Sequence, residues 1–154
     1  MPDDGIGASV LRKEDFRFLT GRGNYTDDIN RPGQTHAVIL RSPHAFAKIN
    51  GIDISAAKSA PGVVAIFTGA DMAADEIGGL PCGWLIHNKD GSPMNEPGHP
   101  PLVTDHARHV GDQVAVVIAE TRTQARDAAD LIEVDYEVLK ACVDTASADK
   151  DDAA

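Results

Sequence analysis

The sequence predicts a mixed α+β domain in which a single sheet carries two main helices and a long loop rich in glycine and proline. Three observations support this class. The chain has 154 residues, of which 42% are hydrophobic. Short apolar runs of strand length recur along it, and an amphipathic helical pattern lies between two of them. A chain of this length buries about 70% of the surface of its unfolded form, which is enough for a core.

The first half of the domain is predicted to contain three strands and one short helix. Residues 35–41 (THAVILR) include four consecutive apolar side chains, so apolar residues would point to both faces of a strand. This predicts a strand that is buried on both faces. Residues 48–52 form a second short strand, and residues 54–59 form a helix that a Pro-Gly pair ends. Residues 63–68 (VVAIFT) are rich in β-branched side chains and predict a buried strand.

Residues 69–108 are different, because glycine and proline recur through them and neither helical nor strand periodicity is visible. Long ordered loops are uncommon in compact domains, and they usually serve a function or press against a partner. The only tryptophan, Trp84, lies within this loop. Two interpretations stay open for it: the side chain plugs the edge of the core, or it anchors an interface, where tryptophan is enriched.

The second half shows the clearest pattern. Residues 114–119 (VAVVIA) predict a buried strand, and Thr121 and Gln124 have the spacing of a helix capping box. Small apolar residues then share one helical face: Ala125, Ala128, Ala129 and Ile132. Residues 132–138 alternate apolar and acidic side chains, which predicts a strand with one wet face. Strand, helix and strand joined by short loops predict a βαβ-type crossover.

These elements divide the chain into three parts. Residues 1–34 are predicted to be an N-terminal arm with turns, and residues 35–144 to be the domain itself, with the long loop at 69–108. Residues 145–154 (TASADKDDAA) are small and acidic, and they predict a disordered tail.

Composition excludes several function classes. With 14 Lys and Arg against 24 Asp and Glu, the net charge is -10, so nucleic acid and anionic lipid surfaces repel the chain. No apolar run approaches the ~20 residues of a membrane span. The two cysteines, Cys82 and Cys142, are too few for an iron–sulfur cluster. They fit a reducing compartment, and with no signal peptide at the N-terminus we expect a cytoplasmic protein.

Motifs for catalysis or metal binding are weak. A Gly-Arg-Gly sequence at 21–23 does not lie between a strand and a helix, so it predicts a tight turn and not a phosphate loop. His99, His106 and His109 lie close in sequence, but their separations in a Pro-rich loop do not match the tight spacing of zinc sites. The residues therefore predict no catalytic, cofactor-binding or metal-ligating side chain.

Five sequence blocks, in the same order, resemble the start of the large subunit of molybdenum hydroxylases. They are residues 5–29, 40–47 (LRSPHAFA), 61–65 (PGVVA), 110–115 (VGDQVA) and 134–137 (VDYE). The family comprises xanthine dehydrogenase, aldehyde oxidase and aerobic carbon-monoxide dehydrogenase, and the matching part is its a/b hammerhead domain. The loop at 78–84 (GGLPCGW) favours the branch similar to carbon-monoxide dehydrogenase. The sequence departs from the family pattern at Gln113, where proline is frequent.

The resemblance implies a role as a structural part of a larger enzyme. Family large subunits are several times longer, and their molybdopterin-binding part follows this domain. The resemblance thus implies molybdopterin in the whole enzyme, with iron–sulfur clusters and FAD on partner subunits. It implies oxidation of carbon monoxide, an aldehyde or an N-heterocycle, with water as the oxygen source. Neither Cys82 nor Cys142 matches the copper-binding cysteine of the family, and this chain alone is expected to be inactive.

The partner expected for this chain is the molybdopterin-binding domain of the same large subunit. The residues expected near it are Arg41, Ser42, Pro43 and His44, together with Trp84. An equally open interpretation of the first four is a structural turn, with Arg41 paired to a carboxylate and His44 exposed. The alternative function is a stand-alone, non-catalytic domain that binds a partner or a ligand. A domain that normally packs on a partner should expose an apolar patch, whereas a stand-alone domain should not.

Overall fold

The computed structural model describes Gly7, residues 11–148 and Lys150. The chain forms two compact units, and the boundary between them in the sequence follows Gln34. Most of residues 1–10, and residues 149 and 151–154 of the predicted acidic tail, lie outside the described residues. Residues 145–148, the described part of that tail, form a turn in which Ser147 N–H donates to the Asp144 carbonyl at 3.1 Å. Disorder of the acidic tail stays a prediction.

The first unit contains a five-residue helix, α1 (Asp15–Leu19), and a 3₁₀ turn, η1 (Thr26–Asp28). The rings of Phe18 and Tyr25 stack with centroids 5.3 Å apart and connect the two elements. Gly21, with φ of 69°, lies in the left-handed region that glycine adopts at no steric cost. The Gly-Arg-Gly sequence therefore forms a turn, as predicted.

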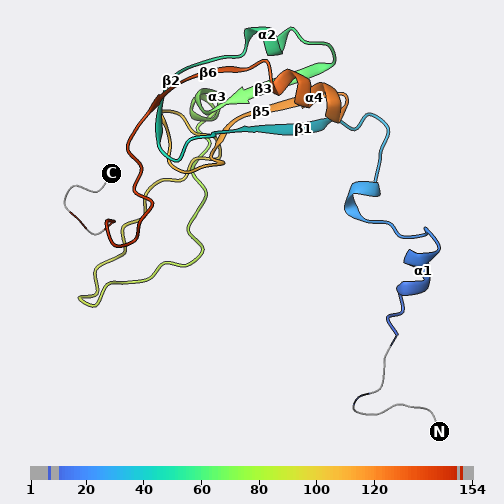
Figure 1. Cartoon of the computed structure of the whole chain (residues 1–154), viewed down its shortest axis with the longest axis horizontal. Coiled ribbons are helices and arrows are strands. Elements are labelled where there is room, and N and C mark those ends of the chain that lie inside the picture. Colours follow the sequence, from blue (N-terminus) through green and yellow to red (C-terminus); the bar gives the residue numbers. More distant parts are fainter. Residues whose placement is uncertain (1–6, 8–10, 149, 151–154) are drawn as a thin grey trace. The chain divides into compact units, whose positions relative to one another are not determined.

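The second unit contains two antiparallel sheets of three strands each (Figure 1). The first sheet has the order β1-β5-β3, with bounds β1 His36–Arg41, β5 Gln113–Ala119 and β3 Val63–Thr68. The second sheet has the order β4-β2-β6, with bounds β4 His106–Ala107, β2 Ala47–Asp53 and β6 Glu133–Val138. The mixed α+β class is confirmed.

The prediction of one sheet is wrong. Strand periodicity identifies each strand but not its partner, and β1 pairs with β5, more than seventy residues away, instead of with β2. The predicted crossover is wrong for the same reason. The chain leaves β5 in the first sheet, forms a helix and enters β6 in the second sheet, so the two strands are not neighbours.

The described residues of this unit form three helices: α2 (Ser55–Lys58), α3 (Gly69–Ala74) and α4 (Arg122–Ala129). Helix α4 packs across the first sheet with its alanine face, and Ala125 and Ala128 are fully buried there. Its N-cap is Thr121, whose Oγ1 accepts the Gln124 N–H at 3.2 Å. The capping hydroxyl is confirmed, but the Gln124 side chain accepts from that hydroxyl (2.8 Å) and not from the backbone of Thr121.

Helix α3 was not expected, because its first residue is glycine and the segment is too short for a period. Its N-cap is Thr68, whose N–H and hydroxyl both donate to the Asp71 carboxylate, at 2.6 and 2.8 Å. These bonds, the one from the Thr68 backbone above all, lower the pKa of Asp71. The cap therefore favours the ionised side chain.

The core lies between α4 and one face of the first sheet, and it continues to the second sheet. Ala115, Val117 and Ala119 of β5 point into it and are fully inaccessible. Ile52 of β2 and Val134 of β6 pack against the same cluster, and this contact joins the two sheets.

The opposite face of the first sheet is not covered in the same way. Along β1, side chains alternate between half-buried and exposed, so the prediction of a strand buried on both faces is wrong. Helix α4 covers one face only. The cross-strand register places six apolar side chains together on the other, here called the open face: Ala37, Ile39, Ala65, Phe67, Val116 and Ile118. Ile39 is 37% exposed there.

Residues 75–105, between α3 and β4, form what we call the long hairpin loop, which extends away from the sheets (Figure 1). Its two arms are joined by sparse backbone bonds: Leu80 N–H to the His99 carbonyl (2.7 Å) and Met94 N–H to the Ile86 carbonyl (3.2 Å). Asn88 N–H donates to the Ser92 carbonyl (2.9 Å) across the tip. The loop is irregular, as predicted, but it folds back on itself. Among the described residues, no helix has the length and apolarity needed to cross a membrane.

Candidate functional site

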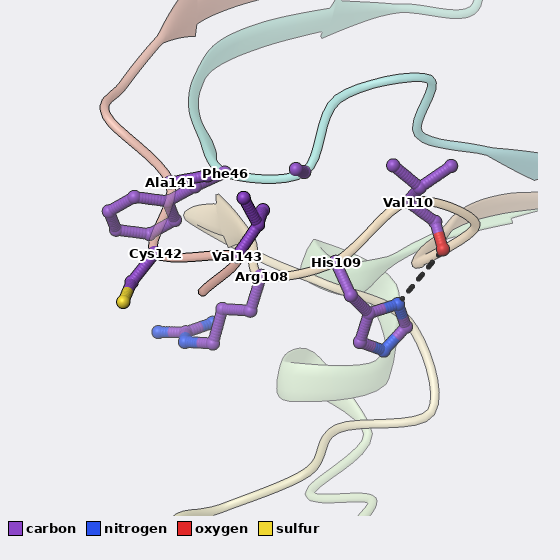
Figure 2. A pocket seen from close by; sticks show the side chains of 8 residues that line it. Phe46, Arg108, His109, Val110, Ala141, Cys142 and Val143 are labelled. Carbon is purple, nitrogen blue, oxygen red and sulfur yellow. Dashed lines mark hydrogen bonds between the residues drawn. The ribbon is translucent and has the colours of Figure 1, made fainter. Parts of the chain in front are cut away.

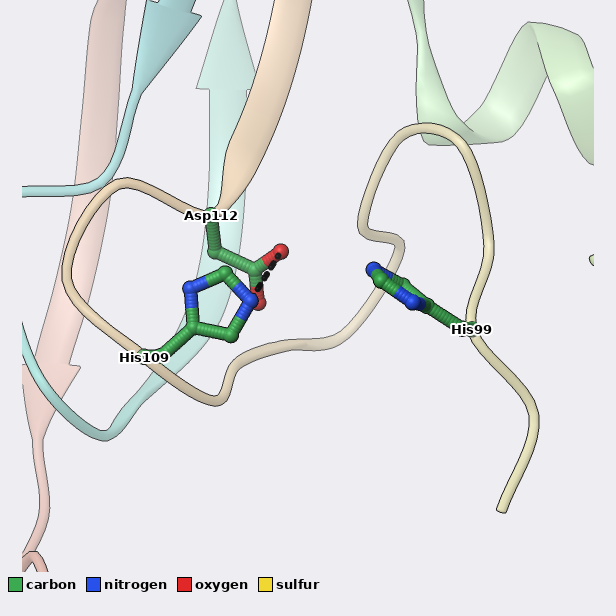
Figure 3. A group of neighbouring side chains, drawn as sticks. All are labelled: His99, His109 and Asp112. Atoms are coloured by element: carbon green, nitrogen blue, oxygen red, sulfur yellow. Dashed lines mark ion pairs between the residues drawn. The ribbon is translucent and has the colours of Figure 1, made fainter. Parts of the chain in front are cut away.

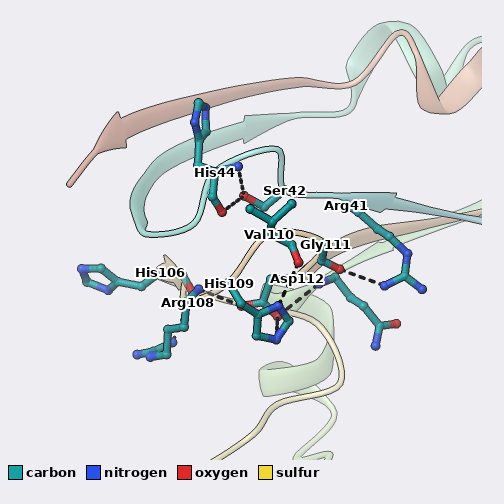
Figure 4. A network of polar contacts seen from close by, with 10 residues as sticks. Arg41, Ser42, His44, His106, Arg108, His109, Val110, Gly111 and Asp112 are labelled. Carbon is teal, nitrogen blue, oxygen red and sulfur yellow. Dashed lines mark hydrogen bonds and ion pairs between the residues drawn. The ribbon is translucent and has the colours of Figure 1, made fainter. Parts of the chain in front are cut away.

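Four of the predicted interface residues begin with Arg41, the last residue of β1, and continue through Ser42, Pro43 and His44 into the connection to β2. They lie against the turn between β4 and β5 (Figure 4). Ser42 is only 2% exposed. Its N–H donates to the Asp112 carbonyl and its own carbonyl accepts the Gly111 N–H, each at 2.8 Å. The Ser42 hydroxyl accepts the His44 N–H at 3.1 Å. Ser42 thus holds the two turns together.

Arg41 strengthens the same junction, since its guanidinium donates to the Gly111 carbonyl at 2.8 Å. The expected carboxylate partner is therefore replaced by a backbone carbonyl. His44 is half-buried, and its ring meets Tyr136 edge-on with centroids 4.9 Å apart. Burial raises the pKa of the Tyr136 hydroxyl. The two details of the structural-turn interpretation, a carboxylate partner for Arg41 and an exposed His44, are therefore not found, and contact with a neighbouring domain stays a prediction.

Asp112 is the buried charge at the centre of this junction, with 5% exposure. One carboxylate oxygen, Oδ2, accepts the Arg108 N–H at 2.8 Å, and Oδ1 accepts the Gln113 N–H at 3.2 Å. Sequence reasoning missed this residue. The signal that points to it is the preceding Gly111, whose φ of 88° closes the turn and directs Asp112 inward.

A second group forms where the long hairpin loop meets this turn (Figure 3). Ligand atoms of His99, His109 and Asp112 all lie within 4.8 Å of one another. The structure brings His99 and His109 together, whereas His106, the third histidine considered from the sequence, is not part of this group. His106 pairs with Asp105 (3.0 Å), and this bond lowers the pKa of the Asp105 carboxyl.

Beside the same turn is a groove of ≈ 600 Å³ (Figure 2). Its wall combines the guanidinium stem of Arg108 and the ring of Phe46 with the chain after β6, which contributes Cys142 and Val143. Val143 is 85% exposed. The groove is open and largely apolar, which is typical of a surface for contact with another polypeptide.

Trp84, the fifth predicted interface residue, is 80% exposed on the long hairpin loop. The interpretation that it plugs the edge of the core is therefore wrong. Four more large apolar side chains of the same loop are at least half exposed: Ile77, Leu80, Leu85 and Ile86. The loop thus presents an apolar arm to its surroundings.

The described residues do not form a cradle for a pterin cofactor. Such a group needs buried donors for its phosphate and ring. The buried polar residues are Ser42 and Asp112, and the described part of the chain contains no buried side-chain nitrogen or oxygen that lacks a partner. The expectation that this chain holds no cofactor-binding residue stays a prediction.

Comparison with known proteins gives a consistent result. Residues 20–140 match the family model described as "Aldehyde oxidase and xanthine dehydrogenase, a/b hammerhead domain". The chain is 42% identical over 139 residues to the nicotine 6-hydroxylase large subunit of Paenarthrobacter nicotinovorans, covering 90% of this chain and 16% of the relative. It is 38% identical to the carbon monoxide dehydrogenase large chain of Afipia carboxidovorans, covering 97% of this chain and 17% of the relative.

A solved structure of a Cu,Mo-CO dehydrogenase superposes with a TM-score of 0.77 at 36% identity, covering 96% of this chain and 17% of that one. The chain thus spans about a sixth of the length of the proteins it matches. The similarity covers both sheets and the long hairpin loop.

Proposed function

The chain belongs to the aldehyde oxidase and xanthine dehydrogenase family as its a/b hammerhead domain, and from this premise we propose that it is a structural domain of a molybdenum hydroxylase large subunit. Its role is to pack against the molybdopterin-binding domain of that subunit. Catalysis would take place in the partner domain, and this chain would contribute support and shape to it.

The exposed apolar arm of the long hairpin loop is the observation that carries the proposal. Trp84, Leu85 and Ile86 are consecutive and are 80%, 60% and 55% exposed. Covering a large apolar side chain stabilises an assembly by about 1.5–3 kcal/mol, so three such residues together favour a covered state strongly. Tryptophan is also enriched among the residues that dominate binding energy.

The open face of the first sheet supports the same conclusion. Six apolar side chains from three strands lie on it, and one of them, Phe67, is aromatic. A sheet in a compact protein normally has both faces covered or one face polar. An apolar sheet face that carries a side chain as exposed as Ile39, at 37%, fits a domain that is one part of a larger folded body.

For the whole enzyme we propose oxidation of carbon monoxide, an aldehyde or an N-heterocycle, with water as the oxygen source. Molybdopterin in the partner domain would supply the oxygen-transfer chemistry. Partner subunits with iron–sulfur clusters and FAD would carry the electrons away. The two cysteines are free thiols, which fits the cytoplasm as the location.

Changing Trp84 to serine is expected to impair assembly of the large subunit. The substitution removes an apolar contact from the proposed interface, but it leaves the fold of this domain intact because the side chain is 80% exposed. We expect less molybdenum bound per large subunit and earlier thermal unfolding of the whole subunit. The measurements are elemental analysis and calorimetry of the purified large subunit.

The matched control is Leu131→Ser, which removes an exposed apolar side chain (46% exposed) after α4, on a different part of the domain. It is expected to leave molybdenum content unchanged. Equal and unchanged molybdenum content in both variants would contradict docking through the loop.

A further inference from the structure

We propose that His99, His109 and Asp112 form a binding site for a divalent transition-metal ion of the zinc type. It consists of two imidazoles and one carboxylate, a donor set that zinc accepts together with a fourth ligand such as water. Sequence spacing did not predict it, because one histidine comes from the long hairpin loop and the other two residues from the β4–β5 turn.

The three ligand side chains converge on one region, and this is the first observation that supports a metal site. Their ligand atoms lie within 4.8 Å of one another, although the residues come from two segments of the chain (Figure 3). The Nε2 of His109 and the Oδ1 of Asp112 are 3.7 Å apart. That separation is too long for a good hydrogen bond. It is close to the roughly 3.4 Å between two ligands that share one tetrahedral zinc ion at usual bond lengths.

The two ring nitrogens of His109 have different neighbours. Its Nδ1 lies 3.3 Å from the Val110 carbonyl (Figure 2), and its Nε2 lies 3.7 Å from Oδ1 of Asp112. In the tautomer that donates from Nδ1 to this carbonyl, the lone pair of Nε2 is available to a metal ion. Metal-binding histidines typically donate their second ring nitrogen to a carbonyl or carboxylate in this way.

Asp112 is the anchor of the site. Its carboxylate is held rigidly by the Arg108 and Gln113 N–H groups, at 2.8 and 3.2 Å, and its side chain is 7% exposed. A buried carboxylate with fixed orientation needs little reorganisation to accept a cation. The imidazoles of His109 and His99 face this carboxylate. The guanidinium of Arg108 lies instead 3.7 Å from the Asp105 carboxylate.

His99 completes the group from the opposite side. Its ring stands perpendicular to that of His109, at 88°, with centroids 6.4 Å apart. Its backbone is fixed at the base of the long hairpin loop, where its carbonyl accepts the Leu80 N–H at 2.7 Å. A bound ion would therefore join the base of the loop to the β4–β5 turn. The loop carrying Trp84 would become less mobile as a result.

Isothermal titration calorimetry of the full 154-residue chain with zinc chloride, after treatment with a chelator, tests the proposal. We expect one zinc ion per chain with micromolar or tighter affinity, and at least a tenfold weaker affinity for His99→Ala and for His109→Ala. The matched controls are His106→Ala, three residues from His109, and His87→Ala, in the same loop as His99; both are expected to bind zinc like the parent chain. Circular dichroism verifies that each variant is folded.

A second readout follows the loop directly. Hydrogen exchange of the Leu80 amide is expected to slow when zinc is added to the parent chain, and to stay the same when zinc is added to His99→Ala. Absence of zinc binding in the parent chain would overturn the proposal. So would unchanged affinity in His99→Ala or an equal loss in His106→Ala, which would assign the ion to other residues. None of these results bears on docking through Trp84, so the two proposals fail separately.

Discussion

Replacing Gly69 with alanine is expected to lower the free energy of unfolding by about 3 kcal/mol, at the upper end of the usual cost of overpacking. Gly69 is the first residue of α3 and is buried. A methyl group there would overlap the backbone carbonyl of Val103 and lie about 3.0 Å from that of Leu102. Backbone atoms do not rotate away as a side chain does, so α3 or the segment at residues 102–103 would have to shift.

Urea denaturation of the purified chain measures this effect. Gly51→Ala is the matched control, because an added Cβ at Gly51 meets no heavy atom within 4 Å and its φ is not in the left-handed region. It is expected to change stability by no more than about 0.5 kcal/mol. Equal stabilities for the two variants would show that α3 does not pack on residues 102–103 as described.

Replacing Asp112 with alanine is expected to destabilise the chain by about 3 kcal/mol. The substitution leaves two backbone N–H groups, of Arg108 and Gln113, without their charged acceptor in a buried turn. Hydrogen bonds to a charged group contribute about 1.5–3 kcal/mol each to stability. A buried N–H group that loses its acceptor also keeps the free-energy cost of having been removed from water. Asp112→Asn, which keeps one acceptor oxygen, is expected to lose roughly half as much.

This measurement is made with a chelator present, so that metal binding does not contribute. The control is Asp127→Ala on α4, an exposed position that changes net charge by the same amount. It is expected to be nearly neutral. If Asp112→Ala were as stable as Asp127→Ala, the carboxylate would not be the support of the β4–β5 turn.

Much of the fold follows from local pattern. The alanine face of α4, its Thr121 cap and the alternation along β6 up to Tyr136 agree with the structure, because each is set by residues within one turn or one strand of each other. Val138, expected on the apolar face of β6, is 63% exposed. The pairing of strands does not follow from local pattern. The partner of β1 is chosen by the core that forms with α4, far along the sequence, and this is why one sheet was predicted where two exist.

The candidate sites likewise combine features that follow from local sequence with features that depend on the folded chain. The end of β1 near Arg41 could be anticipated from Pro43, whereas the sequence left the exposure of Trp84 open between two interpretations. Burial of Asp112 and the approach of His99 to His109 could not be anticipated, because they depend on how the long hairpin loop returns to the domain. Residues separated by loops meet only in the folded chain.

The central claim is that this chain works as part of a molybdenum hydroxylase. The most direct test is the molybdenum content of native material captured from source cells with an antibody against residues 35–144. The account predicts molybdenum equimolar with the antigen, in a particle much larger than the 16.3 kDa of this chain. A free 16.3 kDa protein without molybdenum would contradict it.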